Sequence, residues 1–513
     1  MSCPIIPNPI VDLTPELQGK LKDHVEDVLA RIVDANLHTR YAQESPVFND
    51  FRNAVGHLCD ECEGRKTFLL EAFYATVPLT TYASHEPFVA KLLQQPCREG
   101  EIKDLFAPGL PVTIASSSTT SGRTPKLFPK YLHPLGSDRI GLPFSKTGGN
   151  TCATFSMASH RVVGVRGDAG GEDKRIPVAF ISTCIIRMLH DLDLDKDTSL
   201  MKMIMPGMTS PFAVTFLRNY RSFLLVHALF ALVDRKLEIL FASLSTIFVD
   251  MIRYMEEEWD TLVYCIEMGK LPDYEGVDEI REHLQPNFPR NPSRAAELRA
   301  IGISTATPGW LAKIWPGLKT AVSIVSGVFS AAVPKMQHYV GPNVHIRAVG
   351  YIASEGSIGT VYDPQELNLF RSITGDVVEY LDVSLDETAA GLVPAWELQT
   401  GHKYEIVLTT RNGLWRYRME DIVEIAGFDP RDGTPILKYV ERRNAVVRLG
   451  MGTATGKTLT DAIFSVEKSL GKIVEFTVLV DERVMPPRIG FLVEVEGAVG
   501  QLTLLTVTPR RFI

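Results

Sequence analysis

Short β-prone runs bounded by glycine or proline recur along this chain, and they constrain its fold more than any other feature. The clearest are residues 320–325, 344–349 and 404–409, and residues 111–115 form an earlier one. Helical or loop material separates them. Strands that alternate with helical stretches predict an α/β architecture with mixed sheets covered by helices.

The helical stretches are recognised by apolar residues at helical spacing. Residues 12–75, 86–106 and 211–268 show this pattern. The most apolar part, residues 223–251, is interrupted by charged side chains such as Asp234 and Glu238. We therefore expect core helices there and no membrane span.

The character of the chain changes near residue 443, where a polar segment interrupts the apolar runs. We expect a helix at 459–470 and strands at 475–480 and 489–495 after it. We expect a large N-terminal domain over residues 1–443 and a small, shortened C-terminal α+β domain over residues 444–513.

Charge and cysteine content exclude some classes of function. The chain has 53 Lys and Arg against 61 Asp and Glu, a net charge of −8. The sequence contains no Lys/Arg-rich run of the kind that indicates a nucleic-acid partner. The N-terminus lacks the features of a signal peptide. Seven scattered cysteines predict reduced thiols in a cytoplasmic protein, and the lone pair Cys59 and Cys62 favours two helix thiols over a metal site.

Residues 115–126, ASSSTTSGRTPK, combine a run of hydroxyls with one glycine and Lys126. A β-prone run precedes them, and Pro129 disfavours a following helix, so we expect strand–loop–strand. Such a loop can bind phosphates through backbone N–H groups, hydroxyls and an ammonium. A plain Ser/Thr linker is the alternative. The Walker-like segment 450–458 fails the motif spacing because Met451 stands where a glycine is required.

Two further segments carry carboxylates after β-prone runs. Ser354 and Glu355 would lie at the end of a strand, where a carboxylate beside phosphates commonly holds Mg²⁺. Asp421 could accept hydrogen bonds from both ribose hydroxyls. A surface salt bridge for Glu355 and an ordinary charged turn for Asp421 are the alternatives.

In this order and spacing, the three segments resemble the nucleotide motifs of adenylate-forming enzymes with a firefly-luciferase-like fold. They are specifically similar to the auxin-responsive Gretchen Hagen 3 acyl acid–amido synthetase family, whose motifs read roughly SSGTSxGxxK, YxSSE and YRxGD. Flanking segments at 77–82, 241–262, 314–336 and 404–428 extend the similarity, which covers residues ~20 to ~495.

The resemblance implies roles for individual residues. It assigns Lys126 and Glu355 to catalysis, with Glu355 also the Mg²⁺ ligand. The residues that it assigns to ATP and to the bordering acyl site are Ser117, Ser118, Thr120, Ser121, Ser326, Gly327, Tyr351, Ser354 and Asp421. The implied enzyme is an ATP-dependent ligase that activates a carboxylic acid as an acyl-adenylate and conjugates it to an amine, typically of an amino acid. The partners are these small molecules, without nucleic acid or membrane.

Departures from the family pattern keep two alternatives open. Thr119 and Arg123 replace the glycines of the first motif, and Glu420 replaces the glycine before Asp421. The family's late catalytic lysine has no match after Val495. The chain could therefore be an acyl-CoA-type ligase with the same adenylation step, or a catalytically impaired nucleotide- or acyl-binding homologue.

Overall fold

The structure is a computed structural model. It describes residues 9–56, 64–117, 125–132, 149–157, 161–168, 171–443, 447–449, 452–454, 456–481 and 488–495. Contacts group the chain into two compact units, residues 1–419 with 424–438, and residues 420–423 with 439–513. The domain boundary that we placed after residue 443 remains a prediction.

The predicted helical opening forms the first helices of the first unit. They are α1 (Pro15–Asn36), α2 (Arg40–Glu44), α3 (Asn49–Val55), α4 (Arg65–Thr76), α5 (Tyr82–Leu92) and α6 (Glu99–Ile102). The Thr14 hydroxyl accepts a hydrogen bond from Leu17 N at the start of α1, and Pro15 occupies its first turn. The single helix expected over 86–106 is wrong, because α5 ends at Leu92 and a short strand precedes α6.

A five-stranded mixed sheet carries the first candidate segment. Its order is β1 (Cys97–Arg98), β5 (Arg161–Arg166), β6 (Lys174–Phe180), β2 (Thr113–Ser116) and β3 (Leu127–Lys130). β2 is parallel to β6 and antiparallel to β3. The helices after β6 are α7 (Ile181–Leu189) and α8 (Asp197–Leu200).

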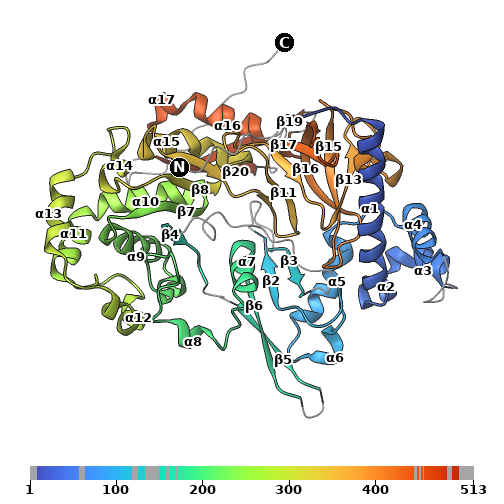
Figure 1. The fold of residues 1–513 in the computed structure, drawn as a ribbon, viewed down its shortest axis with the longest axis horizontal. Coiled ribbons are helices and arrows are strands. Elements are labelled where there is room, and N and C mark those ends of the chain that lie inside the picture. Colours follow the sequence, from blue (N-terminus) through green and yellow to red (C-terminus); the bar gives the residue numbers. More distant parts are fainter. Residues whose placement is uncertain are drawn as a thin grey trace. The chain divides into compact units, whose positions relative to one another are not determined.

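A second sheet has four parallel strands. Its order is β4 (Asn150–Thr154), β7 (Leu237–Leu244), β8 (Thr320–Ile324) and β9 (His345–Ala348). Seven helices accompany it: α9 (Tyr220–Val233), α10 (Ser245–Glu257), α11 (Trp259–Met268), α12 (Val277–Leu284), α13 (Pro292–Ile301), α14 (Trp310–Ile314) and α15 (Val333–Val340). Most of them gather at the left of Figure 1, whereas α1 to α5 lie at the right.

The sequence-based expectation of helices throughout residues 223–251 is wrong, because β7 runs through this stretch. β7 pairs with β4 on one side and β8 on the other. Its residues 239–242 are all buried. A central strand covered on both faces is apolar without alternation, so periodicity does not distinguish it from a buried helix.

An eight-stranded sheet carries the second and third candidate segments. Its order is β10 (Tyr351–Ile352), β11 (Ser357–Val361), β12 (Phe370–Ser372), β17 (Pro435–Arg442), β16 (Tyr417–Phe428), β15 (Lys403–Thr409), β13 (Val377–Asp382) and β14 (Leu392–Val393). The predicted strands at 320–325, 344–349 and 404–409 are confirmed as β8, β9 and β15.

A buried aromatic cluster joins the N-terminal helices to the segment that precedes β16. The ring of Trp415 lies 5.1 Å from that of Phe48, 5.3 Å from that of Phe51 and 5.9 Å from that of Phe73. The next residue, Arg416, is also buried. This packing places the chain just before the third candidate segment in the hydrophobic core.

The second unit contains β18 (Val447–Leu449), β19 (Gly452–Ala454), α16 (Gly456–Ser465), α17 (Glu467–Leu470), β20 (Ile473–Asp481) and β21 (Arg488–Val495). β20 and β21 pair antiparallel. The Phe464 ring of α16 lies 6.0 Å from the Phe476 ring of β20. The predicted helix followed by two strands is confirmed.

His227 of α9 is a neutral histidine in the core of the first unit. It is 1% exposed, and its Nδ1 lies 3.0 Å from Ser210 Oγ. Within the described residues its Nε2 has no hydrogen-bond partner. Burial lowers the pKa of His227 from 6.5 to about 3.

We expect this histidine to make the protein less stable in mild acid. Below pH 6.5 the unfolded chain binds a proton that the folded chain does not, so the free energy of unfolding falls as the pH drops from 6.5 toward 3. The loss should be about 2 kcal/mol at pH 5 relative to pH 7.5. Urea denaturation at several pH values measures it. His227→Asn should remove this component, whereas the exposed control His38→Asn should keep it; equal pH profiles for all three proteins contradict the prediction.

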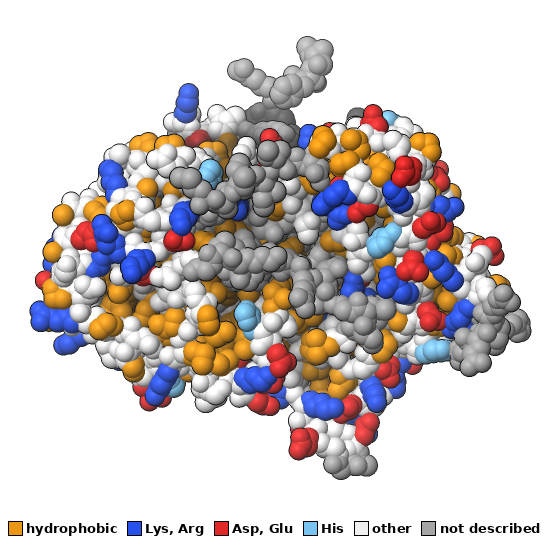
Figure 2. All heavy atoms as spheres, viewed as in Figure 1, with side chains coloured by type: hydrophobic (Ala, Val, Ile, Leu, Met, Phe, Trp, Pro, Cys, Tyr) orange, Lys and Arg blue, Asp and Glu red, His pale blue; other side chains and the backbone are white. Residues whose placement is uncertain are grey.

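Figure 2 shows one face of the molecule, on which lysines and arginines are interspersed with acidic side chains over the described residues. Over the described residues of that face, basic and acidic side chains are mixed and no continuous basic patch forms. Among the described helices, none combines the length and the apolar character needed to cross a membrane.

Candidate functional site

The first candidate segment lies between two antiparallel strands, as predicted. Ser116 of β2 pairs with Leu127 of β3. Beyond this pair, Ser117 N donates to the Lys126 carbonyl (2.8 Å), and Lys126 N donates to Ser117 Oγ (2.9 Å). We call Ser117 and Lys126 the hairpin neck, because these two bonds close the hairpin at the base of the loop.

The remaining loop residues that the sequence analysis selected are Ser118, Thr120 and Ser121. They lie outside the described residues, as do Thr119 and Arg123. Their role in phosphate binding remains a prediction.

Tyr82, the first residue of α5, supports the hairpin neck. Its Oη accepts a hydrogen bond from Leu127 N (3.0 Å) at the start of β3. Its ring centre lies 5.7 Å from Lys126 Nζ, a distance compatible with a cation–π contact. Tyr82 thus holds the strand and the ammonium together. The sequence indicated Tyr82 only through the resemblance of residues 77–82 to the family.

The second candidate segment forms a tight turn after β10 and is bonded to the same hairpin. The turn is closed by Ala353 N, which donates to the Gly356 carbonyl (2.9 Å). Ser354 Oγ donates to the Ser116 carbonyl (3.2 Å). Lys130 Nζ donates to the Glu355 carbonyl (2.8 Å). The structure therefore brings the first two candidate segments together, although Lys130 and Glu355 are 225 positions apart in the chain.

Lys130 is a buried cation that the sequence analysis did not select. It is 5% exposed, and every residue of β3 is buried. Burial lowers the pKa of Lys130 to about 8, while the charges of Glu355, Cys184 and Asp376 act in the opposite direction. Glu355 itself is 6% exposed. A lysine in a short apolar strand was the only signal available in the sequence.

A small cavity lies beside this pair of residues. His85, Phe106 and Asn412 line it together with Lys130 and Glu355. Asn412 Oδ1 accepts a hydrogen bond from Tyr131 N (2.9 Å), which fixes the chain that leaves β3.

Ser326, Gly327 and Tyr351 follow the carboxyl ends of the parallel strands β8 and β9. Gly327 has a φ of +61°, a left-handed conformation that favours glycine, and it begins a 3₁₀ helix (Gly327–Ala332). Val349 N donates to the Ser323 carbonyl (3.2 Å), so the two strand ends lie side by side. Ligands of α/β proteins commonly bind at this edge. Tyr351 is buried, and its ring lies 5.7 Å from that of Phe370.

Asp421 belongs to the second unit and lies on β16. It is 6% exposed, and its Oδ1 lies 4.0 Å from Arg442 Nε. The preceding residue, Glu420, has a φ of +64°, and its carbonyl accepts a hydrogen bond from Arg443 N (2.6 Å). The backbone before Asp421 therefore adopts a conformation that costs a non-glycine residue about 1–2 kcal/mol.

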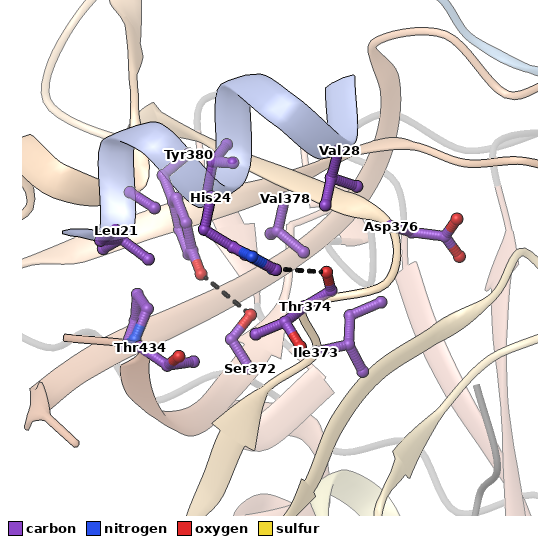
Figure 3. A pocket seen from close by; sticks show the side chains of 13 residues that line it. Leu21, His24, Val28, Ser372, Ile373, Thr374, Asp376, Val378, Tyr380 and Thr434 are labelled. Atoms are coloured by element: carbon purple, nitrogen blue, oxygen red, sulfur yellow. Dashed lines mark hydrogen bonds between the residues drawn. The ribbon is translucent and has the colours of Figure 1, made fainter. Parts of the chain in front are cut away.

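A second cavity lies beneath α1 and contains none of the predicted site residues. Figure 3 shows His24 and Val28 of α1 facing Ser372, Thr374 and Tyr380. The His24 ring Nε2 is 3.0 Å from the Thr374 carbonyl, and Tyr380 Oη donates to Ser372 Oγ (3.4 Å). Its lining is otherwise largely aliphatic, and we assign it no role in nucleotide binding.

Comparison with known families decides the identity of the chain. Residues 16–345 match the GH3 family N-terminal domain, and residues 372–442 match the GH3 family central domain. The chain belongs to the GH3 family. The predicted family is thereby confirmed.

Curated relatives of this GH3 protein are acid–amido synthetases. The chain is 25% identical to jasmonoyl–L-amino acid synthetase GH3.5 of Oryza sativa subsp. japonica over 462 residues. This aligned region covers 83% of this chain and 75% of the relative. It is 23% identical over 505 residues to indole-3-acetic acid-amido synthetase GH3.15 of Arabidopsis thaliana, covering 93% and 78%. The predicted enzyme class, an acid–amido synthetase, is the class to which these relatives belong.

A solved GH3 structure has the same fold. The acyl acid amido synthetase AtGH3.15 in complex with 2,4-DB superposes with a TM-score of 0.70 and 22% identity, covering 95% of this chain and 81% of that chain. The predicted fold class, a large α/β domain with mixed sheets and a smaller C-terminal part, is confirmed.

Glu420 is one of the positions at which this GH3 chain departs from the family pattern. The family pattern has a glycine before the aspartate, and Glu420 has the left-handed φ that glycine adopts without strain. A glycine at this position would adopt the same φ without strain, so the backbone seen here is compatible with the family's glycine. A second carboxylate thus lies next to Asp421 in the sequence.

Proposed function

We propose that this GH3 protein activates a carboxylic acid with ATP through the site built by β2, β3 and the Ser354–Glu355 turn, and then conjugates the acyl group to an amino acid. The observation that carries the proposal is the bonding of this turn to both strands of the hairpin, through Ser116 and Lys130. The two strands that flank the predicted phosphate loop and the buried residue Glu355 are thereby held close together.

The reaction has two substitution steps. In the first, a carboxylate oxygen of the acid bonds to the α-phosphorus of ATP, and the bond to the bridging oxygen breaks, so pyrophosphate leaves. In the second, the amine nitrogen bonds to the acyl carbon, the anhydride bond between the acyl carbon and the phosphate oxygen breaks, AMP leaves with its electron pair, and the nitrogen loses a proton. Both steps move negative charge onto phosphate oxygens, which fixed cationic and N–H donors stabilise.

The hairpin neck supplies such donors to the first step. Lys126 lies at the base of the loop with its ammonium against Tyr82, and from there it can neutralise charge on the departing pyrophosphate. The Ser117 hydroxyl accepts a hydrogen bond from Lys126 N and keeps its own proton to donate to a phosphate oxygen. We assign Ser118, Thr120 and Ser121 to the same phosphates.

The donor set fits Mg²⁺, the metal that the family implies. Among the described residues no group of three or more acidic, histidine or cysteine side chains could hold a metal. Mg²⁺ commonly binds one or two carboxylates and takes its remaining ligands from substrate phosphates and water, and the buried Glu355 beside the hairpin meets this requirement. When bound, the ion would neutralise charge on the phosphates of ATP.

We assign the remaining predicted residues to the rest of the ligands. Tyr351 and Ser354 would contact adenine and phosphate, Ser326 and Gly327 would border the adenine and acyl sites, and Asp421 would bind the ribose.

We also propose that the protein is located in the cytoplasm. The four described cysteines, Cys97, Cys152, Cys184 and Cys265, are free and buried, as expected in a reducing compartment.

An exchange assay tests the proposed function. The protein is incubated with MgATP, radiolabelled pyrophosphate and each member of a panel of carboxylic acids. We expect exchange with at least one aromatic or aliphatic acid, followed by product formation when amino acids are added. Product only with coenzyme A would assign the protein to the acyl-CoA ligases. No exchange with any acid, together with no shift of the melting temperature by ATP, would assign it to non-catalytic homologues.

A further inference from the structure

Lys130 is the most unusual side chain of the hairpin, because an ammonium is expensive to bury. Its four-residue strand is buried throughout, and an apolar residue of similar length would pack in the same space. Replacing a buried charge with a well-packed apolar residue often stabilises a fold or leaves its stability unchanged. Lys130 therefore calls for an explanation beyond stability.

The contacts of Lys130 indicate what it does. Its Nζ donates to the backbone carbonyl of Glu355 (2.8 Å), and Ser354 Oγ donates to the Ser116 carbonyl (3.2 Å). The two bonds fasten adjacent residues of one turn to the two different strands of the hairpin. A turn held at one point can still rotate, whereas a turn held at two points has a fixed orientation.

The Lys130 bond also affects the position of the Glu355 carboxylate. The side chain of Glu355 starts from a backbone that the Lys130 bond holds directly, so fixing this backbone restricts the positions that the carboxylate can reach. Removing that bond would leave the turn attached to β2 through Ser354 alone. The fold would survive, because β10 and β11 remain paired on either side of the turn.

We propose that Lys130 is a positioning residue for adenylation, and that its bond to the Glu355 carbonyl fixes the Glu355 carboxylate relative to the phosphate-binding hairpin. This inference rests on the proposed function. In this role Lys130 acts through Glu355 and need not contact ATP or the acid.

Three variants test the inference. Lys130→Met removes the hydrogen bond and the charge but keeps the length of the side chain. Lys130→Gln restores a neutral donor. Lys103→Met is the control, since Lys103 is an exposed lysine on the same unit. The measurements are binding of ATP as a function of Mg²⁺ concentration, the exchange kinetics, the melting temperature without ligand, and amide hydrogen exchange over residues 349–360.

For Lys130→Met we expect the Mg²⁺ concentration for half-maximal ATP binding to rise about tenfold, as is common when a residue that orients a metal ligand is lost. The turn amides should exchange faster, the KM for the acid should stay the same, and the melting temperature should be unchanged or higher. Lys130→Gln should recover part of the Mg²⁺ response, and Lys103→Met should match the wild type.

The outcomes separate this inference from the proposed function. Unchanged Mg²⁺ dependence and unchanged amide exchange in Lys130→Met overturn the positioning role, as does a variant that only melts earlier. A wild-type protein that neither binds ATP nor exchanges pyrophosphate overturns the proposed function instead. In that case faster amide exchange in Lys130→Met would show only that the bond orders the turn, and the role in adenylation would be rejected.

Discussion

Pyrophosphate exchange is expected to fall about a hundredfold or more when Glu355 is replaced by glutamine. The amide keeps the size and one oxygen of the carboxylate but removes its negative charge. A Mg²⁺ ligand depends on that charge, so the loss should appear in kcat and in the Mg²⁺ requirement together. The assay is the same exchange reaction, measured at several Mg²⁺ concentrations with a saturating acid.

The matched control for this change is Glu366→Gln, which alters an exposed glutamate of the same unit. It should retain wild-type exchange. The melting temperature of each variant shows whether the fold is intact. Exchange by Glu355→Gln within a few-fold of the wild-type rate, at every Mg²⁺ concentration, would remove Glu355 from the catalytic site.

The second large effect concerns stability and the pair formed by Arg416 and Glu379. Both side chains are buried, 5% and 7% exposed. Arg416 Nε and Nη2 donate to the two carboxylate oxygens of Glu379 (3.0 and 2.9 Å), and Nη1 donates to the Val77 carbonyl (2.7 Å). The pair thus links β13, the chain before β16 and the end of α4.

We expect Glu379→Gln to lower the free energy of unfolding by about 3–5 kcal/mol, because the guanidinium would remain buried without its counter-charge. Urea denaturation measures the change. In the double variant Glu379→Gln, Arg416→Met much of the loss should be recovered, since neither position then carries a buried charge.

An exposed ion pair provides the comparison. Lys20 and Glu16 of α1 lie 2.6 Å apart, with side chains 56% and 77% exposed, and Glu16→Gln should have a much smaller effect because water screens the charges. If Glu379→Gln were as mild as Glu16→Gln, the Arg416 pair would not contribute to stability as inferred.

The sequence predicted the parts of the fold that depend on local pattern. β8, β9 and β15 are short apolar runs with glycine or proline at their ends, and α1 has a helical apolar face with a threonine cap. β7 was missed because burial on both faces removes the alternation that distinguishes a strand. The strand between α5 and α6 was missed for a different reason, because its two residues are too few to show any periodicity.

The site was predictable to the extent that its residues form ordered motifs. Ser117, Lys126, Ser354 and Glu355 were selected from the sequence, and the structure brings both segments together. Lys130 and Tyr82 could not be selected in this way. Their importance lies in contacts with Glu355 and Leu127, which are 225 and 45 positions away. Such contacts depend on the tertiary fold and leave no local pattern.

The hairpin neck also has an entropic consequence. The two ends of the loop, Ser117 and Lys126, are already joined by the β2–β3 ladder and by their own reciprocal bonds. The entropy lost on closing the loop is therefore offset by folding, before any nucleotide arrives. Thr119 and Arg123 lie between these two residues in the sequence, and the two bonds that close the hairpin do not involve them. Evolution could accordingly vary the proposed phosphate contacts without having to rebuild the hairpin.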